Sequence, residues 1–472
     1  MQNIQEKELP LLEKSIKAIK YSIDDLRNER YDQAIQMYNT VLKGYETFKS
    51  VNQPNLTKGS LLQVKLSELH KKHEEVVKKF ENNEWNGLDK LIEEDILKRI
   101  EDLQYYVDNR EYYEKYNINV LHKYYKMFKE NGYLEVIDDQ KIEAIQTYYK
   151  KHYKGKVDPS LHLAYEKITG EFNLQVIPQH VIWHEVIPFL NSREMMRFYS
   201  DKNVYDNLIT KDSAPETVLK RVNGQYYDRH NNTISRSKAF KILFDTKEDL
   251  IVKQSLSDDG KGIGKLTYKN HAHYHKKKKY TMKEIEEIWK SNFIVQKLIK
   301  QHSIMANPHP YSVNTVRVVT LRWNDEIHYL MSYARFGVNY SLTDNAASDG
   351  LCVGISPDGT LKLYAVGNKG EIYDKHPTTG YDFSDFDKIP NFNKVIDFAK
   401  DLHNRILHHN YISWDLAIDN NGEPIFIEMN FWGTAWKYQL ACGQSIFGEF
   451  TEEILQAVAK QREEQLAKQK DK

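Results

Sequence analysis

The sequence predicts an α+β protein in which a helical region precedes a domain built around β-sheet. The first 158 residues hold only two of the 12 prolines and five of the 21 glycines, which is typical of a chain with few turns. Apolar residues recur there at steps of three and four, as in Leu12, Ile16, Ile19 and Ile23. Residues 412–430, ISWDLAIDNNGEPIFIEMN, instead have strand-like halves on both sides of a turn signal.

The length of the chain leaves room for more than one domain. With 472 residues, we expect a helical region at 1–175, a sheet-containing domain at 176–460 and a charged tail at 461–472. Pro54 and Gly59 interrupt the helical pattern of the first region. The simplest product is a pair of antiparallel helical arms that meet at this turn.

The overall charge excludes several broad classes of partner. Lysine plus arginine equals aspartate plus glutamate at 67 each, so no net field draws the chain to nucleic acid or to a membrane surface. No apolar run approaches the ~18 residues of a membrane span. The N-terminus lacks the apolar core of a secretory signal, and two cysteines imply no disulfide framework. We therefore expect a cytoplasmic protein without a membrane span.

A lysine-bearing strand precedes a glycine-rich loop in the middle of the chain. Lys253 lies in an apolar strand pattern, and Gly260, Gly262 and Gly264 follow it. Glycines let backbone amides approach a phosphate, and a lysine adds a point charge to the same oxygens. Taken alone, such a loop is more often a flexible hairpin. Upstream, we expect a helix over 193–208 that carries a second lysine.

The segment 412–430 predicts a hairpin with an acidic face. If Asn421 and Gly422 form a two-residue loop, Asp415 lies opposite Glu428. Asn430 shares that face because side chains alternate along a strand. Polar residues on a strand face are most often solvated, but the other positions on this face are mostly apolar or small. Three oxygen ligands on a rigid hairpin suit a hard cation such as Mg²⁺.

These motifs together resemble a known family. The spacing of Asp415, Glu428 and Asn430 after a Gly- and Lys-rich section resembles the metal-binding hairpin of ATP-grasp enzymes. Five further motifs narrow the resemblance: NPHPYSVNTVRVVT at 307–320, ARFG at 334, DN at 344, GLCVGI at 350 and HPTTG at 376. They are similar to the sugar-transfer-associated ATP-grasp family of bacterial polysaccharide clusters. The similarity runs from about residue 195 to 450, and the helical region lies outside it.

The resemblance implies an ATP-grasp fold, in which two α+β subdomains sandwich ATP, with ATP and one or two Mg²⁺ ions as cofactors. It implies that Asp415, Glu428 and Asn430 hold the metal and that Lys202 and Lys253 neutralise phosphate oxygens. The other implied nucleotide contacts are Gly260, Gly262, Gly264, Gln296, Lys297, Leu298, Ile299 and His302, the last at the ribose.

The resemblance also implies an acceptor site. Arg317 and Arg335 are the candidate catalytic residues, because a guanidinium can grip a carboxylate and an acyl-phosphate bidentately. Their alternative is a structural salt bridge. The implied substrate contacts are Asn314, Thr315, Asp344, Asn345 and His376. By default Asp344 and Asn345 are turn formers, and His376 is a loop histidine.

Three functions compete on this evidence. The first is an ATP-dependent ligase that joins a carboxylate to an amine through an acyl-phosphate, with small-molecule, sugar-linked substrates or a polysaccharide precursor. The second is a phosphotransferase with a hydroxyl acceptor at the same nucleotide site. The third is an interaction protein with a vestigial site, against which the complete acidic set and both lysines argue. The helical region is a candidate surface for a homodimer or for docking a glycosyltransferase.

Overall fold

The computed structural model describes residues 2–56, 60–209, 213–256, 262–275, 278–342, 344, 350–433 and 435–470. The chain divides into two compact units, 1–126 and 127–472. This division precedes the boundary expected at 175, because the segment after 126 makes contacts with the sheet-containing part. Tyr133, for example, donates its hydroxyl to the carbonyl of Gly370 at 2.8 Å. The limits 1–175, 176–460 and 461–472 stay a prediction.

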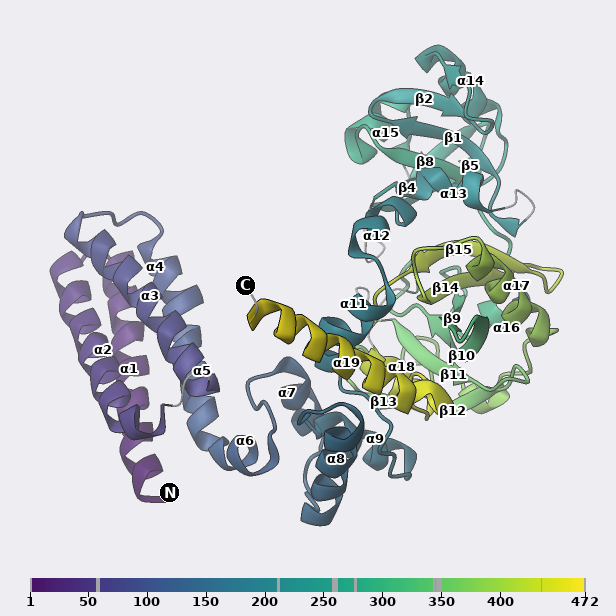
Figure 1. Cartoon of the computed structure of the whole chain (residues 1–472). Helices are drawn as coiled ribbons and strands as arrows, with labels where there is room; N and C mark the ends of the chain where they lie inside the picture. The colour runs from purple at the N-terminus through teal and green to yellow at the C-terminus, as the bar shows by residue number, and fades with distance from the viewer. Residues whose placement is uncertain are drawn as a thin grey trace. The chain divides into compact units, whose positions relative to one another are not determined.

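The first unit is helical, as the apolar spacing predicts. Leu12, Ile19 and Ile23 are buried, and a buried ion pair joins Glu8 to Arg110 at 2.9 Å. Its main helices are α1 (Gln2–Arg27), α2 (Tyr31–Asn52), α3 (Leu61–Glu81), α4 (Leu88–Leu91), α5 (Lys98–Asp108) and α6 (Arg110–Tyr116) (Figure 1).

The helices that follow lead into the sheets. They are α7 (Lys123–Glu130), α8 (Asp139–His152), α9 (Ser160–Thr169), α10 (Gln179–Val181), α11 (Ile187–Leu190), α12 (Arg193–Tyr199) and α13 (Tyr205–Leu208). The single helix expected over 193–208 is wrong. The Asp201 carboxylate accepts the Asn203 amide at 2.9 Å and begins a separate turn, η4 (Lys202–Val204).

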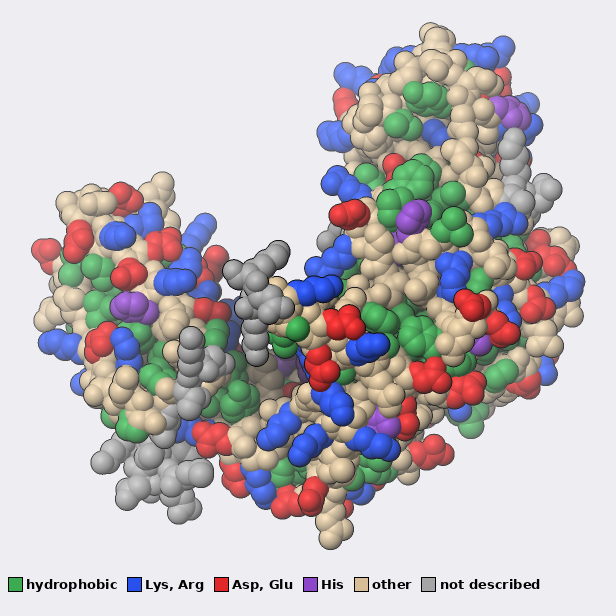
Figure 2. Space-filling view, in the orientation of Figure 1, with side chains coloured by type: hydrophobic (Ala, Val, Ile, Leu, Met, Phe, Trp, Pro, Cys, Tyr) green, Lys and Arg blue, Asp and Glu red, His purple; other side chains and the backbone are tan. Residues whose placement is uncertain are grey.

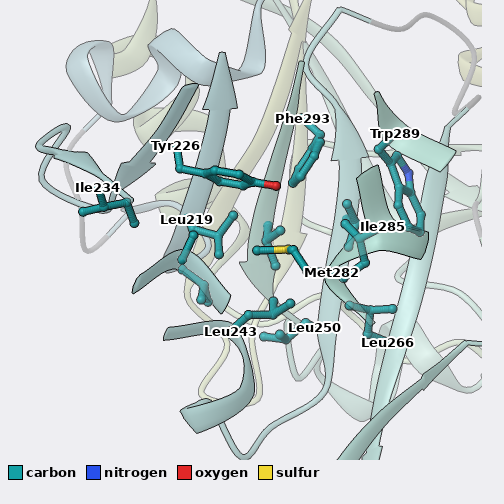
Figure 3. Packing of buried hydrophobic residues seen from close by; sticks show 14 residues of the cluster. Leu219, Tyr226, Ile234, Leu243, Leu250, Leu266, Met282, Ile285, Trp289 and Phe293 are labelled. Atoms are coloured by element: carbon teal, nitrogen blue, oxygen red, sulfur yellow. The ribbon is translucent and has the colours of Figure 1, made fainter. Parts of the chain in front are cut away.

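The first sheet has eight strands in the order β3-β2-β1-β8-β4-β5-β6-β7. They are β1 (Thr217–Val222), β2 (Gln225–Asp228), β3 (Thr233–Ile234), β4 (Leu250–Gln254), β5 (Ile263–Lys269), β6 (Ala272–His275), β7 (Lys278–Lys279) and β8 (Phe293–Lys297). Helices α14 (Arg236–Asp245) and α15 (Met282–Trp289) supply Leu243, Ile285 and Trp289 to its core (Figure 3).

The second sheet has seven strands in the order β13-β12-β11-β10-β9-β14-β15. They are β9 (Thr315–Trp323), β10 (Glu326–Phe336), β11 (Leu351–Ile355), β12 (Leu361–Val366), β13 (Ile372–Tyr373), β14 (Tyr411–Ile418) and β15 (Pro424–Asn430). Short helix α16 (Ser303–Ala306) precedes the sheet, and α19 (Thr451–Lys470) ends the described chain.

Two helices cover opposite faces of this second sheet. Thr320 on β9 bonds to His403 of α17 (Phe392–Asn404) at 2.7 Å, whereas Arg317 on the same strand bonds to Tyr438 of α18 (Ala435–Cys442) at 2.9 Å. Positions three apart on a strand face opposite sides. Strand β14 is therefore buried on both faces, including Trp414 and Asp415.

On the outer surface, basic and acidic side chains are interspersed over the face that Figure 2 shows.

In the part of the chain that the structure describes, no helix is both long and apolar enough to cross a bilayer.

Close packing of α18 on β11 yields a stability prediction. A methyl group on Gly354 would overlap the carbonyl of Ala441 and come within 2.8 Å of Cys442 Cα. Because both neighbours are backbone, we expect Gly354→Ala to lower the free energy of unfolding by ~1–3 kcal/mol. Urea unfolding followed by tryptophan fluorescence measures this loss. A urea midpoint equal to that of the wild type would show that α18 shifts to admit the methyl group.

Candidate active site

The β14–β15 hairpin places the predicted acidic residues side by side. Asp415 lies directly opposite Glu428, and Ser413 lies opposite Asn430. The Asn430 side-chain amide donates to Asp415 Oδ2 at 3.2 Å. The expected pairing of Asp415 with Glu428 is thus confirmed, and Asn430 shares their site.

The turn that produces this pairing differs from the expected one. Gly422 has a φ of +83°, but Asn421 does not take a left-handed conformation. The Gly422 amide donates to the Asp419 carbonyl at 2.9 Å, and Asp419 pairs with Glu423 across the loop. The loop therefore holds one residue more than the Asn-Gly turn predicts. A bulge at Ile427, between the pairs Asp415–Glu428 and Leu416–Phe426, restores the register.

Two arginines from neighbouring strands hold the Asp415 carboxylate. Arg317 on β9 places Nε 2.5 Å from Asp415 Oδ1 and Nη2 2.5 Å from Oδ2. Arg335 on β10 donates from Nη1 to Asp415 Oδ2 at 2.7 Å. Its Nη2 lies 3.6 Å from Asp344 Oδ1. The arrangement is a buried network of two guanidinium groups and two carboxylates.

The pKa values of the two carboxyl groups in this network shift in opposite directions. Burial would raise the pKa of Asp415, but the charges of Arg317 and Arg335 outweigh it and hold this pKa below its usual range. Burial also raises the pKa of Asp344, and there Arg335 only partly offsets it. Asp415 is therefore the fixed negative charge of the site.

Both predicted lysines lie beside the acidic pair. Lys202 Nζ is 3.6 Å from Glu428 Oε2, and the Lys202 main-chain amide donates to the Ser255 carbonyl at 3.0 Å. Lys253 on β4 is only 9% exposed. Burial and, to a smaller extent, the Lys202 charge lower its pKa to about 8, and Glu428 partly opposes both effects.

A cavity of about 250 Å³ lies between the two sheets. Its lining includes Lys202, Lys253 and Glu428, and the predicted residues Lys297, Leu298 and Ile299. Gln296 and His302 do not line it. The Gln296 amide donates to the Pro215 carbonyl at 3.5 Å, and the His302 ring accepts the Ile304 amide at the start of α16.

The three glycines of the loop have different positions. Gly260 lies outside the described residues. Gly262 has a φ of +72°, which a side chain rarely adopts. Gly264 faces the buried indole of Trp289, and a methyl group there would come within 2.9 Å of Trp289 Cη2. Since Ile263 and Lys265 line the cavity, the structure gives Gly264 a packing role on the opposite face of β5.

Among the predicted acceptor residues, some line the cavity and others support loops. Thr315 lines the cavity and donates its hydroxyl to Asp344. Asn314 is fully buried and donates to the carbonyls of Met305 and His309. His376 is fully buried and bonds to the Gly337 carbonyl at 2.7 Å. Asn314 and His376 hold the loops in place and do not line this cavity. Asn345 lies outside the described residues.

A larger cleft, of about 1200 Å³, adjoins the cavity. Four residues line both spaces, namely Lys202, Arg335, Asp344 and Glu428. These four charged side chains therefore lie where the cavity adjoins the cleft. Sequence analysis missed Tyr438 and Lys437 of α18, which reach this cleft from a helix that carries no recognisable motif.

The donor set has the oxygen chemistry of a hard-cation site, and in this structure both Asp415 oxygens accept hydrogen bonds from Arg317 or Arg335. Among the described residues, no three His, Cys, Asp or Glu side chains converge. The predicted set is instead two carboxylates, Asp415 and Glu428, with the Asn430 amide. An oxygen-only set with few protein ligands is the kind that Mg²⁺ shares with phosphate groups.

Comparisons with known proteins give matches to both parts of the chain. The family model described as sugar-transfer associated ATP-grasp matches residues 182–456, and a domain of unknown function matches residues 4–105. No curated protein matches the sequence.

Three similar solved structures are ligases. An L-amino acid ligase from Bacillus licheniformis has 12% identity and a TM-score of 0.31, covering 56% of this chain and 48% of its own. A D-alanine–D-alanine ligase from Bacillus anthracis has 11% identity and a TM-score of 0.31, covering 57% and 69%. The ATP-grasp ligase PsnB, complexed with a precursor peptide and AMPPNP, has 13% identity and a TM-score of 0.32, covering 57% and 62%. The chain thus spans about half of the first of these proteins.

Proposed function

Because the chain belongs to the sugar-transfer associated ATP-grasp family, we propose that it joins a carboxylate to an amine at the expense of ATP. The proposed intermediate is an acyl-phosphate, and the proposed carboxylate or amine belongs to a sugar or polysaccharide precursor. One observation carries the proposal. Lys202, Arg335, Asp344 and Glu428 line both the cavity between the sheets and the larger cleft beside it.

The cavity residues suit the nucleotide side of this reaction. The ammonium groups of Lys202 and Lys253 would neutralise phosphate oxygens, and Lys297, Leu298 and Ile299 would border the base. Asp415, Glu428 and Asn430 would hold Mg²⁺. When bound, the metal supplies positive charge to the phosphates. The protein groups therefore spread the charge of the transferring phosphoryl group, which is most of what this chemistry requires.

Arg335 and Arg317 suit the acceptor side. Arg335 borders both spaces, so its guanidinium can orient a carboxylate that enters from the cleft toward the γ-phosphate. A carboxylate oxygen would attack this phosphorus and release ADP. The amine would then attack the acyl carbon, expel phosphate and lose one proton. Arg317 binds Asp415 and Tyr438, which makes it a positioning residue for the network.

Isotope transfer tests the proposal directly. Purified protein is incubated with Mg-ATP, ¹⁸O-labelled uronic and amino acids, and amines. The ligase predicts that ADP and phosphate are released together and that one ¹⁸O appears in the phosphate. ADP formation with phosphate retained on a hydroxyl acceptor would instead identify a phosphotransferase at the same site. ADP release that needs no carboxylate would refute the ligase.

The lowered pKa of Lys253 predicts a pH-dependent affinity for nucleotide. Bound phosphate favours the charged ammonium, whose pKa in the free protein is about 8. Above pH 8 the free protein must take up a proton on binding, so affinity should fall by up to ~10-fold per pH unit. Calorimetry with AMPPNP at pH 8.5, in buffers of different ionisation enthalpy, measures this uptake.

One variant tests the pH prediction and a second serves as its control. Lys253→Met should abolish the proton uptake and flatten the pH dependence above 8. Lys394→Gln should change neither, because Lys394 lies on the surface and pairs with Glu423 at 2.8 Å. Proton uptake of the same size in Lys253→Met would show that another group titrates.

A further inference from the structure

The cleft beside the nucleotide cavity is large for a small metabolite. Its volume of about 1200 Å³ exceeds the ~300–1,000 Å³ of most small-molecule sites. Helix α12, the end of β15 and helix α18 contribute its lining. A ligand that fills it must extend over more than one ring.

The lining of the cleft is strongly basic. Two acidic side chains, Asp344 and Glu428, line it. Its basic side chains are Arg193, Arg197, Lys202, Arg317, Arg335 and Lys437. Three of these, Arg193, Arg197 and Lys437, have no carboxylate partner among the residues that the structure describes. The cleft therefore presents uncompensated positive charge.

Lys437 is the least expected of these groups. It is 1% exposed, and its ammonium donates to the Gly350 carbonyl at 2.8 Å. A buried charge without a counter-ion is costly, and burial accordingly lowers the pKa of Lys437. Because Lys437 lines the cleft, an anionic ligand group could reach it and supply the missing charge.

Two tryptophans give the cleft flat apolar faces. The Trp183 indole N–H donates to the Gly433 carbonyl at 2.8 Å, which fixes the orientation of this ring. Trp432 is 40% exposed, and the Arg193 guanidinium lies 5.6 Å from its ring centroid. The C–H faces of sugar rings pack on aromatic surface, and the Arg193 guanidinium beside Trp432 has no carboxylate partner of its own among the described residues.

We propose that this cleft binds an acidic oligosaccharide, a chain of sugar rings that carries several carboxylates. The rings would pack on Trp183 and Trp432, and the carboxylates would pair with Arg193, Arg197 and Lys437. The inference rests on the proposed function, because one carboxylate would extend to Arg335 at the junction. Arg193 and Arg197 lie one helical turn apart on α12, so they suit acid groups on the same side of a chain.

Calorimetry on the full chain without nucleotide tests the inference. The probes are a galacturonic acid tetramer, galacturonic acid itself, a neutral glucose tetramer and a glucose oligomer phosphorylated to the same charge. We expect the acidic tetramer to bind more tightly than the other probes, and to bind more weakly as salt increases. Equal binding of the neutral tetramer, or tighter binding of the phosphorylated oligomer, would overturn the inference.

Variants separate the cleft from the cavity. The double variant Arg193→Gln, Arg197→Gln and the single variant Trp432→Ala should each bind the acidic tetramer at least ~10-fold more weakly. Their affinity for AMPPNP should stay unchanged, which also shows that they fold. Lys394→Gln should match the wild type with both ligands. Unchanged tetramer affinity in the double variant would contradict the assignment.

The two proposals can fail separately. Tight binding of the acidic tetramer without carboxylate-dependent ADP release would refute the ligase but support the cleft. Carboxylate-dependent ADP release with no preference for the acidic tetramer would support the ligase and refute the cleft.

Discussion

Replacing Glu428 by alanine is expected to abolish most ADP release while leaving the protein folded. Glu428 borders both the cavity and the cleft, and its carboxylate faces Lys202 at 3.6 Å. The change removes a proposed metal ligand without removing core volume. We expect turnover to fall by at least ~10²-fold, the scale of losing one electrostatic contact to the transition state. Steady-state ADP release and the thermal midpoint measure the two effects.

The same hairpin offers a matched control. Glu423 carries the same carboxylate at the turn and pairs with surface Lys394 at 2.8 Å. Glu423→Ala should retain wild-type turnover, because exposed ion pairs contribute ~0–1 kcal/mol and this one is outside the site. Wild-type turnover in Glu428→Ala would remove Glu428 from the proposed metal site.

Asp415→Ala is expected to damage stability more than any other single change in the site. Asp415 is buried and accepts bonds from both Arg317 and Arg335. Its loss leaves two buried guanidinium groups without their shared partner. Breaking a buried ion pair from one side costs ~3–5 kcal/mol, and we expect at least this loss in the free energy of unfolding.

Urea unfolding, followed by tryptophan fluorescence, measures the loss. Glu423→Ala is again the control and should shift the midpoint little. A combined variant, Asp415→Ala with Arg317→Met, should recover part of the lost stability because it removes one orphaned charge. A midpoint unchanged in Asp415→Ala would show that the arginines find other partners.

The sequence predicted the parts that depend on local pattern. Apolar spacing predicted the helices of the first unit, and alternation on two strands predicted that Asp415 lies opposite Glu428. That pairing is confirmed, although the loop is longer than expected and the bulge at Ile427 corrects the register. A two-residue signal such as Asn-Gly favours a turn but does not fix its length.

Contacts between distant segments could not be predicted in this way. Arg317 meets Asp415 because β9 pairs with β14 in the sheet, an order that no local spacing encodes. Gly264 looked like a phosphate contact, whereas the Trp289 indole occupies the space beside it. Asn314 and His376 belong to motifs, and no local pattern indicates that both are buried and bonded to loop carbonyls.

The bulge at Ile427 makes chain length, and not only residue identity, a determinant of this site. In a regular strand Ile427 and Glu428 would face opposite sides, yet both line the cavity between the sheets. Deleting Ile427 would still leave Asp415 opposite Glu428, because Ile427 is the extra residue that forms the bulge. The deletion would thus remove an apolar wall from the cavity and keep the acidic pair. The number of residues in β15 therefore decides which side chains line the cavity, whereas the pairing of Asp415 with Glu428 does not depend on it.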